Sequence, residues 1–395
     1  MNTHKSNSKS VVLYVTTGLG TGGAERMLYN LLSMLNQERF SPVVVSLIDN
    51  GTVGDRIEAL GIPVHTIGME AGRLPTPNVF WRLIHLVREI KPDLIQGWMY
   101  HGNLAAQLAS IFSQLRNIPV LWNIQHSMYS LEYEKKTTRA VIQLGAKLSK
   151  YPISVVFVSQ TGKLQHEAIG YCSNNSCVIP NTSDTSLFIP SFEAKLSVRS
   201  ELGLAENTFL IGLFARYHPM KDHSNFLHAA ALLLKYHPDI HFLLAGTEVN
   251  QENQTLYQLL EQLGLFNHVH LLGERNDMPR LTAALDIASS ASAYGEAFPL
   301  ILGEAMSCGV PCVVTDVGDS GWIVGNTGTV VPSKNPELLA NAWKELIDLS
   351  AEGRENLGKA ARARIIEDFS LSSVVGQYEK LYESSFAKKL TSKSK

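Results

Sequence analysis

Short apolar runs and helix-like runs alternate along the chain of 395 residues. The run "VVLYVT" at residues 11–16 has the length and β-branched content of a buried strand, and "AERMLYNLLSML" at residues 24–35 has apolar residues at helical spacing. Alternation of this kind predicts βαβ units and parallel sheets, because each parallel strand is joined to the next by a crossover helix. The sequence therefore predicts an α/β protein.

The alternation occurs in two series, which are separated by a polar, turn-rich segment. This segment, "IPNTSDTSLFIPSFE" at residues 179–193, contains two prolines and has the composition of a linker. We therefore predict a first Rossmann-like domain over residues 1–185 and a second one over residues 195–370. A last helix is predicted at about residues 371–388.

Composition and charge narrow the classes of function. Apolar residues make up 45% of the chain and charged residues 18%, which is ordinary for a protein with sizeable α/β cores. The net charge of −2 argues against a nucleic-acid binder that relies on bulk positive charge. The chain has neither a signal-peptide pattern nor an apolar run of about 18 residues, so a cytoplasmic protein is expected.

The first strand–loop–helix junction is rich in glycine. In "TTGLGTGGAERML", Gly18, Gly20 and Gly23 satisfy the spacing G-x-G-x-x-G, and Asp49 ends the next strand. This spacing leaves an NAD(P)-dependent dehydrogenase open as an alternative. Glycines in such a loop also serve any ligand that approaches the backbone closely, or only the turn itself.

The second junction is cationic. In "GLFARYHPMKDH", Arg216 directly follows a predicted strand and Lys221 lies five residues further on. Side chains at the carboxyl end of a parallel strand face the ligand crevice of such folds. Arginine binds phosphate oxygens in a bidentate manner and lysine adds a point charge, so the pair could hold a diphosphate. Two ordinary surface cations are the alternative.

A pair of glutamates flanks a predicted helix start. In "SAYGEAFPLILGEAM" at residues 292–306, Glu296 and Glu304 stand eight positions apart, and Pro299 between them suits the first turn of a helix. The N–H groups at that helix start would form an anion site. One carboxylate for ribose hydroxyls and one for a sugar would fit a sugar nucleotide. A structural helix with two solvated glutamates is the alternative.

These motifs occur together and in order, and in that combination they resemble the retaining GT-B glycosyltransferases of family four. The resemblance covers nearly the whole chain and rests on the stretches "GGAER", "IPNTSDTSLF", "FARYHPMKDH", the E-x7-E spacing and "GEAMSCGVPCVVTDVGD". The chain most resembles the members of this family that build bacterial surface polysaccharides. The resemblance implies two Rossmann-like domains that face each other across a cleft, with the last helix packing back onto the first domain.

The resemblance also implies the site. The donor-binding residues would be Gly22, Gly23, Arg216, Lys221, Arg275, Phe298, Pro299, Leu300 and Glu304. His126 and Glu296 would be the catalytic residues, acting as positioning groups rather than as nucleophiles. Two positions depart from the family pattern, which usually has glycine where this chain has Thr182 and Ala297.

Within that site, the resemblance gives each group a role. Arg216 and Lys221 would hold the donor diphosphate, Glu304 the ribose, and the segment around Arg275 would lie next to the base. Glu296 and the backbone from Phe298 to Leu300 would position the sugar, as would His126. Gly22 and Gly23 would approach the diphosphate or the acceptor.

The expected reaction is transfer of a glycosyl unit, with retained configuration, from a nucleoside diphosphate sugar to a hydroxyl group. A UDP-sugar is the expected donor, and a saccharide or polyprenyl-linked saccharide of a capsule, O-antigen or exopolysaccharide is the expected acceptor. We expect no cofactor and no metal, because the chain has no D-x-D motif and fixed cations could take its place.

The expected acceptor places the protein in the cytoplasm, with a possible peripheral contact to the inner face of the membrane. A basic segment could make that contact through Lys135, Lys136, Arg139, Lys147 and Lys150. A solvated helix face explains the same residues. Besides the dehydrogenase, two alternatives stay open: a sugar-nucleotide epimerase of similar fold, which should lack the paired glutamates, and a non-catalytic sugar-nucleotide-binding protein.

Overall fold

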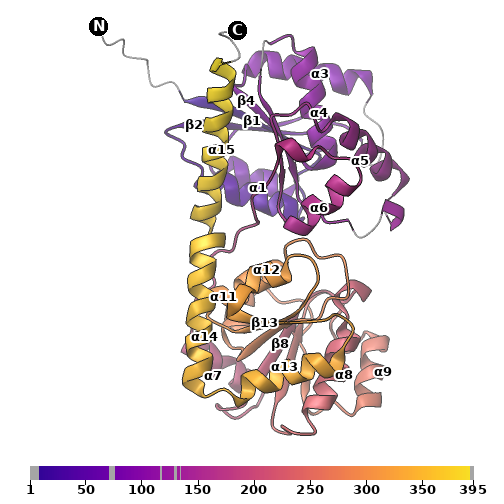
Figure 1. Ribbon diagram of the computed structural model, residues 1–395, viewed down its shortest axis with the longest axis vertical. Coiled ribbons are helices and arrows are strands. Elements are labelled where there is room, and N and C mark those ends of the chain that lie inside the picture. The colour runs from indigo at the N-terminus through magenta and orange to yellow at the C-terminus, as the bar shows by residue number, and fades with distance from the viewer. Residues whose placement is uncertain (1–8, 71–75, 116–117, 129–130, 134, 392–395) are drawn as a thin grey trace. The chain divides into compact units, whose positions relative to one another are not determined.

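The computed structural model describes residues 9–391 apart from 71–75, 116–117, 129–130 and 134. The chain forms two compact units (Figure 1). The first comprises the described residues up to Asn181 together with those from Val374 onward, and the second comprises Thr182–Ser373. The division between Asn181 and Thr182 falls within the predicted linker.

The first unit contains a seven-stranded sheet in the order β3-β2-β1-β4-β5-β6-β7. All neighbouring strands are parallel. The strands are β1 (Ser10–Thr16), β2 (Phe40–Ser46), β3 (Val64–Thr66), β4 (Leu94–Trp98), β5 (Val120–Ile124), β6 (Ser154–Phe157) and β7 (Ser176–Val178). The order reverses between β1 and β4, which gives this sheet a topological switch point.

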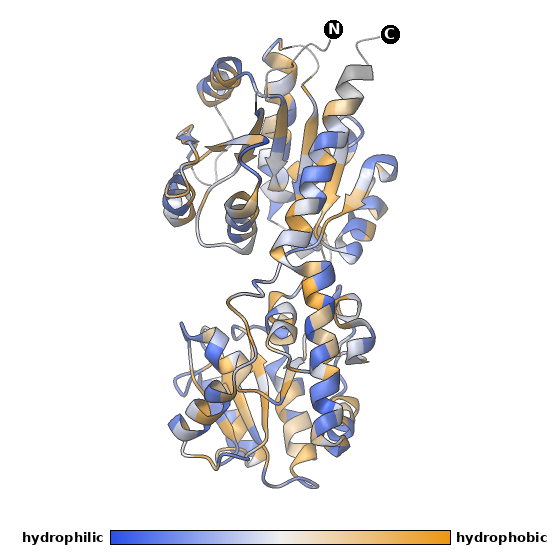
Figure 2. Ribbon diagram, turned by 90° about the vertical axis from the view of Figure 1, so that its left-hand side faces the viewer, coloured by the Kyte–Doolittle hydropathy of each residue, from blue (hydrophilic) through white to orange (hydrophobic). Residues whose placement is uncertain are grey.

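Helices connect these strands, as the alternating sequence predicts. They are α1 (Gly23–Met34), α2 (Gly51–Glu58), α3 (Pro77–Ile90), α4 (Met99–Phe112), α5 (Lys136–Leu148) and α6 (Gln160–Ala168). Strands β4 and β5 are buried along their whole length. This burial explains their mainly apolar sequences, because a parallel sheet is covered by helices on both faces. Figure 2 shows the strands as mainly hydrophobic and most helices as two-sided.

The second unit repeats the same plan with six parallel strands in the order β10-β9-β8-β11-β12-β13. The strands are β8 (Leu210–Phe214), β9 (His241–Ala245), β10 (Val269–Leu271), β11 (Ile287–Ser290), β12 (Cys312–Thr315) and β13 (Gly328–Val331). Its switch point lies between β8 and β11. Both sheets therefore have the Rossmann strand order, and the prediction of two Rossmann-like domains is confirmed.

The helices of the second unit complete its two outer layers. They are α7 (Phe192–Glu201), α8 (His223–Leu233), α9 (Gln254–Leu263), α10 (Met278–Ala283), α11 (Leu300–Ser307), α12 (Ser320–Val324), α13 (Pro336–Asp348) and α14 (Ala351–Arg364). The α8–α13 side has an aromatic centre, where the rings of Phe226 and Trp343 lie 4.9 Å apart. Both side chains are fully buried, so this layer is a packed core.

The last helix, α15 (Leu371–Thr391), is anchored in the first unit by buried tyrosines. The Tyr382 hydroxyl donates to Gln96 Oε1 at 2.5 Å, and the Tyr14 and Tyr382 hydroxyl oxygens lie 3.0 Å apart. One turn earlier, Asn123 Nδ2 donates to the Tyr378 hydroxyl at 2.7 Å. Burial raises the pKa of both helix tyrosines above the ordinary value, so these hydroxyls stay protonated and available as donors.

Candidate active site

Three of the predicted site residues follow the two strands that flank the switch point of the second unit. Arg216 lies two residues after β8, and Lys221 ends a short 3₁₀ turn (Pro219–Lys221) in the same loop. Glu296 lies in the loop after β11. Since ligands of such sheets bind at the carboxyl ends of the strands beside the switch point, the structure brings these residues to the position where a ligand is expected.

Lys221 and Glu296 form an ion pair within this site. Lys221 Nζ lies 2.5 Å from Glu296 Oε1, and the Ser292 hydroxyl donates to the same oxygen at 2.6 Å. The Glu296 side chain is only 7% exposed and the Lys221 side chain 19%. A buried carboxylate needs such partners, because burial of an unpaired charge is costly. The pair neutralises the carboxylate, which removes the electrostatic conflict between a glutamate and a neighbouring anion site.

The two loops are fixed to each other through the backbone. The Ala293 N–H donates to the Met220 carbonyl at 2.8 Å, which ties the loop after β11 to the loop after β8. Gly318 has a φ of +61°, and a Cβ there would come within 2.3 Å of the Glu296 carbonyl oxygen. Glycine is therefore required at Gly318, and the backbone that carries Glu296 is held from both sides.

Helix α11 follows this loop and begins one residue later than predicted. Pro299 is its N-cap, in an extended conformation, and Leu300 is its first residue. The first N–H groups of a helix have no partner within the helix, so those of Leu300 and Ile301 remain for an anion. The Phe298 side chain is 5% exposed and packs on Trp322 and Phe369. Only its backbone could reach a ligand.

The second glutamate lies in a different environment from the first. Glu304 is within α11 and is half-buried, whereas Glu296 precedes the helix and is buried. Helix α11 ends at Ser307 with Cys308 as its C-cap, and Gly309 follows with a φ of +69°, as the predicted C-terminal glycine should. The structure thus places the two glutamates on different elements, which fits two separate roles.

Arg216 is an exposed cation on a well-anchored backbone. The Ala215 N–H donates to the Ala245 carbonyl at 2.9 Å, and the Tyr217 N–H donates to the Thr247 carbonyl at 2.8 Å. Within the described part of the chain, the Arg216 guanidinium makes no hydrogen bond or ion pair with another residue. Its charge is therefore not compensated by a neighbouring carboxylate, unlike that of Lys221.

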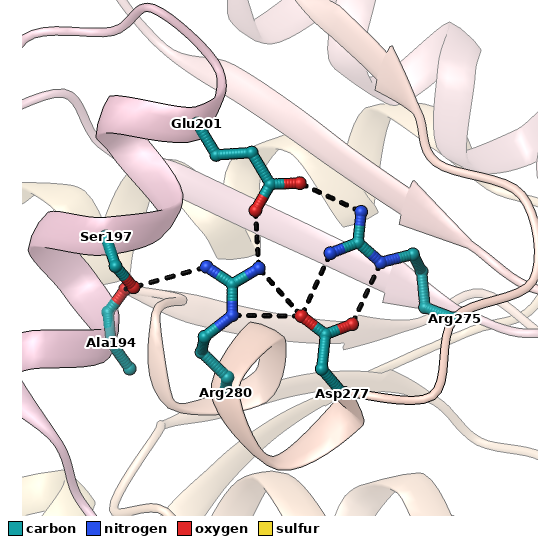
Figure 3. A network of polar contacts seen from close by, with 6 residues as sticks. All are labelled: Ala194, Ser197, Glu201, Arg275, Asp277 and Arg280. Atoms are coloured by element: carbon teal, nitrogen blue, oxygen red, sulfur yellow. Dashed lines mark hydrogen bonds and ion pairs between the residues drawn. The ribbon is translucent and has the colours of Figure 1, made fainter.

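Arg275, in contrast, belongs to a network of arginines and carboxylates (Figure 3). Its guanidinium donates twice to Asp277, at 2.9 Å each, and once to Glu201 at 2.8 Å. Arg280 also contacts both carboxylates. Hydrogen bonds from Arg275 hold the pKa of Asp277 below its usual range. The network links α7 to α10, so Arg275 has a structural role, and contact with a base stays a prediction.

The glycine loop of the first unit is open rather than tightly packed. A Cβ at Gly18, Gly20 or Gly23 would meet no atom within 4 Å. The third glycine of a dinucleotide fingerprint is needed for close packing of helix on strand, and Gly23 has no such contact. Close packing on β1 comes instead from Gly102 of α4, where a Cβ would lie 2.3 Å from the Val15 carbonyl oxygen. This geometry does not support the dehydrogenase.

His126 lies in the loop after β5 and contacts Tyr100, which in turn contacts His166; the sequence singled out neither of these two residues. The Tyr100 hydroxyl oxygen is 3.1 Å from His126 Nδ1 and 2.8 Å from His166 Nε2. Tyr100 follows the end of β4 at the switch point of the first sheet. The rule that pointed to Arg216, a polar residue directly after a strand, could have identified Tyr100. Ser292 lies two residues after β11, so the same rule could have identified it, whereas His166 had no comparable signal.

Three further predictions concern a metal site, a membrane-spanning helix and Thr182 in the linker. The described residues hold no cluster of three or more histidine, cysteine or acidic side chains suited to a metal ion. None of the helices over the same residues is long and apolar enough to span a bilayer. Thr182 is not among the described residues with positive φ, so the linker turn does not require the glycine that the family pattern has there.

Comparisons with known proteins cover both units. Residues 195–364 match the family model described as glycosyl transferases group 1, and residues 21–187 match the model for glycosyltransferase family 4. The chain is 23% identical over 389 residues to the Escherichia coli UDP-Gal:alpha-D-GlcNAc-diphosphoundecaprenol alpha-1,3-galactosyltransferase, which covers 95% of this chain and 97% of that protein. It is 25% identical over 310 residues to a D-inositol 3-phosphate glycosyltransferase of Corynebacterium aurimucosum, over 74% of this chain and 72% of that protein.

Solved structures share the two-domain fold. The Anabaena protein Alr3699/HepE in complex with UDP superposes with a TM-score of 0.81 at 24% identity, over 95% of this chain and all 100% of that one. Its complex with UDP-glucose superposes with a TM-score of 0.76 at 25% identity, over 95% and 99% of the two chains. With a family 4 model over the first unit and a group 1 model over the second, the chain belongs to the nucleotide-sugar-dependent glycosyltransferases of the GT-B fold.

Proposed function

We propose that this glycosyltransferase moves a sugar from a UDP-sugar to a hydroxyl of a saccharide or lipid-linked saccharide, with retained configuration, in the synthesis of a cell-surface polysaccharide. The observation that carries the proposal is the arrangement of Arg216, the Lys221–Glu296 pair and the start of α11 around one switch point. The Anabaena complexes with UDP and UDP-glucose support the donor class, and the Escherichia coli relative supports the acceptor class.

The cationic groups would bind and stabilise the leaving nucleoside diphosphate. Negative charge grows on the diphosphate as the bond to the sugar breaks, and fixed positive groups stabilise that charge best. Arg216 is the group with an uncompensated charge, and the first N–H groups of α11 add the positive end of a helix. Lys221 would have two tasks: to approach the diphosphate and to hold the Glu296 carboxylate.

The two glutamates would divide the donor between them. Glu296 is buried and is held on Oε1 by Lys221 and Ser292, so its position is defined before any sugar binds. A carboxylate so fixed suits a hydrogen bond from a sugar hydroxyl. Glu304 is the candidate for the ribose hydroxyls. Ala297, which replaces the usual glycine, accepts a hydrogen bond from the Asp319 N–H at 3.2 Å and so stabilises the same loop.

The chemistry would need no protein nucleophile. The acceptor hydroxyl attacks the anomeric carbon on the face that the diphosphate leaves, and the departing phosphate oxygen takes the hydroxyl proton. One C–O bond breaks and one forms, and the nucleoside diphosphate is released. In the first unit, His126 would contact the donor sugar, and Gly22 and Gly23 would approach the diphosphate or the acceptor.

The basic helix α5 would contact an anionic membrane surface that carries a lipid-linked acceptor. From Lys135 to Lys150 the sequence has five cations and no acidic residue. Lys135, Lys136 and Lys147 are exposed, as are the apolar side chains of Leu144 (47%) and Tyr151 (59%) next to them. Cations beside exposed apolar groups are the combination that binds anionic lipid surfaces.

Donor hydrolysis is the experiment that tests the proposed function. The protein is incubated, without acceptor, with UDP-, GDP- and other nucleoside diphosphate sugars, and release of free sugar and nucleotide is measured. Slow hydrolysis of a UDP-sugar and thermal stabilisation by UDP are expected. Stabilisation by NAD but by none of the nucleoside diphosphates would contradict the proposal and restore the dehydrogenase. Activity should also persist in EDTA, because fixed cations bind the diphosphate.

A further inference from the structure

A chain of hydrogen bonds runs through the first unit from Gly162 to His126. His166 Nδ1 lies 2.6 Å from the Gly162 carbonyl oxygen, and its Nε2 lies 2.8 Å from the Tyr100 hydroxyl oxygen. The same hydroxyl oxygen lies 3.1 Å from His126 Nδ1. Three side chains from different elements, α6, α4 and the loop after β5, are thus connected in series.

The direction of each bond follows from the first one. A carbonyl oxygen only accepts, so His166 carries its proton on Nδ1. His166 is fully buried, and burial lowers its pKa to about 4, so at neutral pH the ring has a single proton and Nε2 must accept. The one proton of the Tyr100 hydroxyl therefore points to His166. The hydroxyl oxygen can then only accept from His126, whose Nδ1 must carry a proton.

We propose that Tyr100 and His166 are positioning residues that hold His126 in the tautomer with the proton on Nδ1. With Nδ1 protonated, His126 Nε2 is the ring nitrogen that can accept a hydrogen bond from a sugar hydroxyl when the ring is neutral. Two buried residues, Tyr100 and His166, would thereby determine how His126 contacts the donor sugar of the proposed function. This inference deepens the proposed function and rests on it for the identity of the sugar.

The surroundings keep this chain of hydrogen bonds rigid. The His166 ring packs on Phe157 and Tyr171, with ring centroids 5.2 and 5.1 Å away. The carbonyl of Gly162 is fixed because the Gly162 N–H donates to Ser159 Oγ at 2.7 Å, the N-cap of α6. The geometry that sets the direction of the bonds is therefore built into the core of the first unit.

The loop that carries His126 is fixed to the same helix. The Ser127 hydroxyl and the Met128 N–H both donate to Gln165 Oε1, at 2.7 and 2.9 Å. A Cβ at Gly162 would lie 3.3 Å from the His126 carbonyl oxygen, so the first turn of α6 is in direct contact with the His126 backbone. The backbone of His126 is therefore held against α6, which fixes the point from which its side chain reaches Tyr100.

The proposal is tested by the tautomer of His126 in the full-length protein. Nitrogen-15 labelling of histidine distinguishes a protonated Nδ1 from a protonated Nε2, and the signal of His126 among the 13 histidines is identified by its loss in His126→Gln. In the wild type, we expect the proton on Nδ1. In His166→Phe, the Tyr100 hydroxyl loses its acceptor and can donate to His126 Nδ1, so the His126 proton should move to Nε2.

Two further variants complete the experiment. Tyr100→Phe removes the partner of His126 Nδ1 and should also shift the tautomer, whereas Tyr171→Phe removes a hydroxyl from the same aromatic cluster and should leave it unchanged. Both His166→Phe and Tyr100→Phe should lower kcat about tenfold, as expected for one hydrogen bond, with UDP affinity unaltered.

A proton on His126 Nε2 in the wild type, or an unchanged tautomer in both variants, would overturn the inference. Because the tautomer is measured without donor or acceptor, failure of the proposed function would appear separately, as absent turnover.

Discussion

At the scale of single residues, the Lys221–Glu296 pair should contribute both to the stability of the protein and to UDP binding. Lys221→Ala leaves a carboxylate that is 7% exposed without its cation. Loss of one partner from a buried pair costs about 3 kcal/mol, so we expect a clear fall in the free energy of unfolding, together with weaker UDP binding. Chemical denaturation measures the first and calorimetry the second. A variant as stable as the wild type would show that the pair does not stabilise the loop.

Neutralisation of Glu304 and of Glu296 should affect different quantities, UDP affinity for the first and kcat for the second. Glu304→Gln weakens a charged acceptor for the ribose, so affinity for UDP should fall about tenfold whether or not a sugar is attached. Glu296→Gln should leave UDP affinity nearly intact and lower kcat, because its proposed contact is to the group that is transferred. Circular dichroism serves as the folding control. Equal loss of UDP affinity in both variants would refute this division of roles.

His166 also predicts how stability depends on pH. Burial lowers its pKa from the ordinary 6.5 to about 4. Above pH 6.5 the ring is neutral in both states, whereas between pH 6.5 and about 4 only the unfolded chain binds the proton. The free energy of unfolding should therefore fall as the pH falls through this window, by up to about 3 kcal/mol. Denaturation across this range should show a flatter profile for His166→Phe, and identical profiles would contradict the pKa shift.

At the scale of elements, α5 carries the prediction about membranes. Replacement of Lys135, Lys136 and Lys147 by serine should reduce binding to vesicles with anionic lipid about a hundredfold, since each cation near such a surface contributes about 1 kcal/mol. A matched control replaces three exposed lysines of the second unit, Lys235, Lys334 and Lys359. Co-sedimentation at low and high salt is the measurement. Equal binding by both triple variants would assign the contact to another surface.

Most of the strands and helices could be predicted from the sequence, whereas the contacts between residues far apart in the sequence could not. The strand β8 and the helix α8 follow from local apolar patterns, and the end of α11 shortly before Gly309 follows from the glycine itself. The pairing of Lys221 with Glu296 joins residues 75 positions apart, and no local pattern encodes such a contact. Arg275 illustrates the converse, because the family resemblance suggested a ligand contact while its partners, Asp277 and Glu201, give it a structural role.

At the scale of the whole molecule, two copies of one strand order carry different chemistry. The second unit has cations and a paired carboxylate at its switch point, and the first has an open glycine loop and a buried chain of aromatic hydrogen-bonding groups. From motifs alone, the family resemblance assigned the cations and both glutamates to the second domain, and the glycine loop and His126 to the first. The hydrogen bond between Tyr100 and His166 could not be predicted from the sequence, since its direction depends on distances and on burial that only the folded unit defines.

The measurement that tests the account most directly is UDP binding to wild-type protein, Arg216→Ala and Lys235→Ala by calorimetry. Arg216 is exposed and makes no ion pair with the described residues, so its removal should not disturb the fold. Lys235 is an exposed cation beyond the opposite end of α8 and is the matched control. We predict that UDP binds, that Arg216→Ala weakens binding at least about tenfold, and that Lys235→Ala binds as the wild type does. Unchanged affinity in Arg216→Ala, or no binding of UDP by the wild type, would contradict a donor site at this switch point.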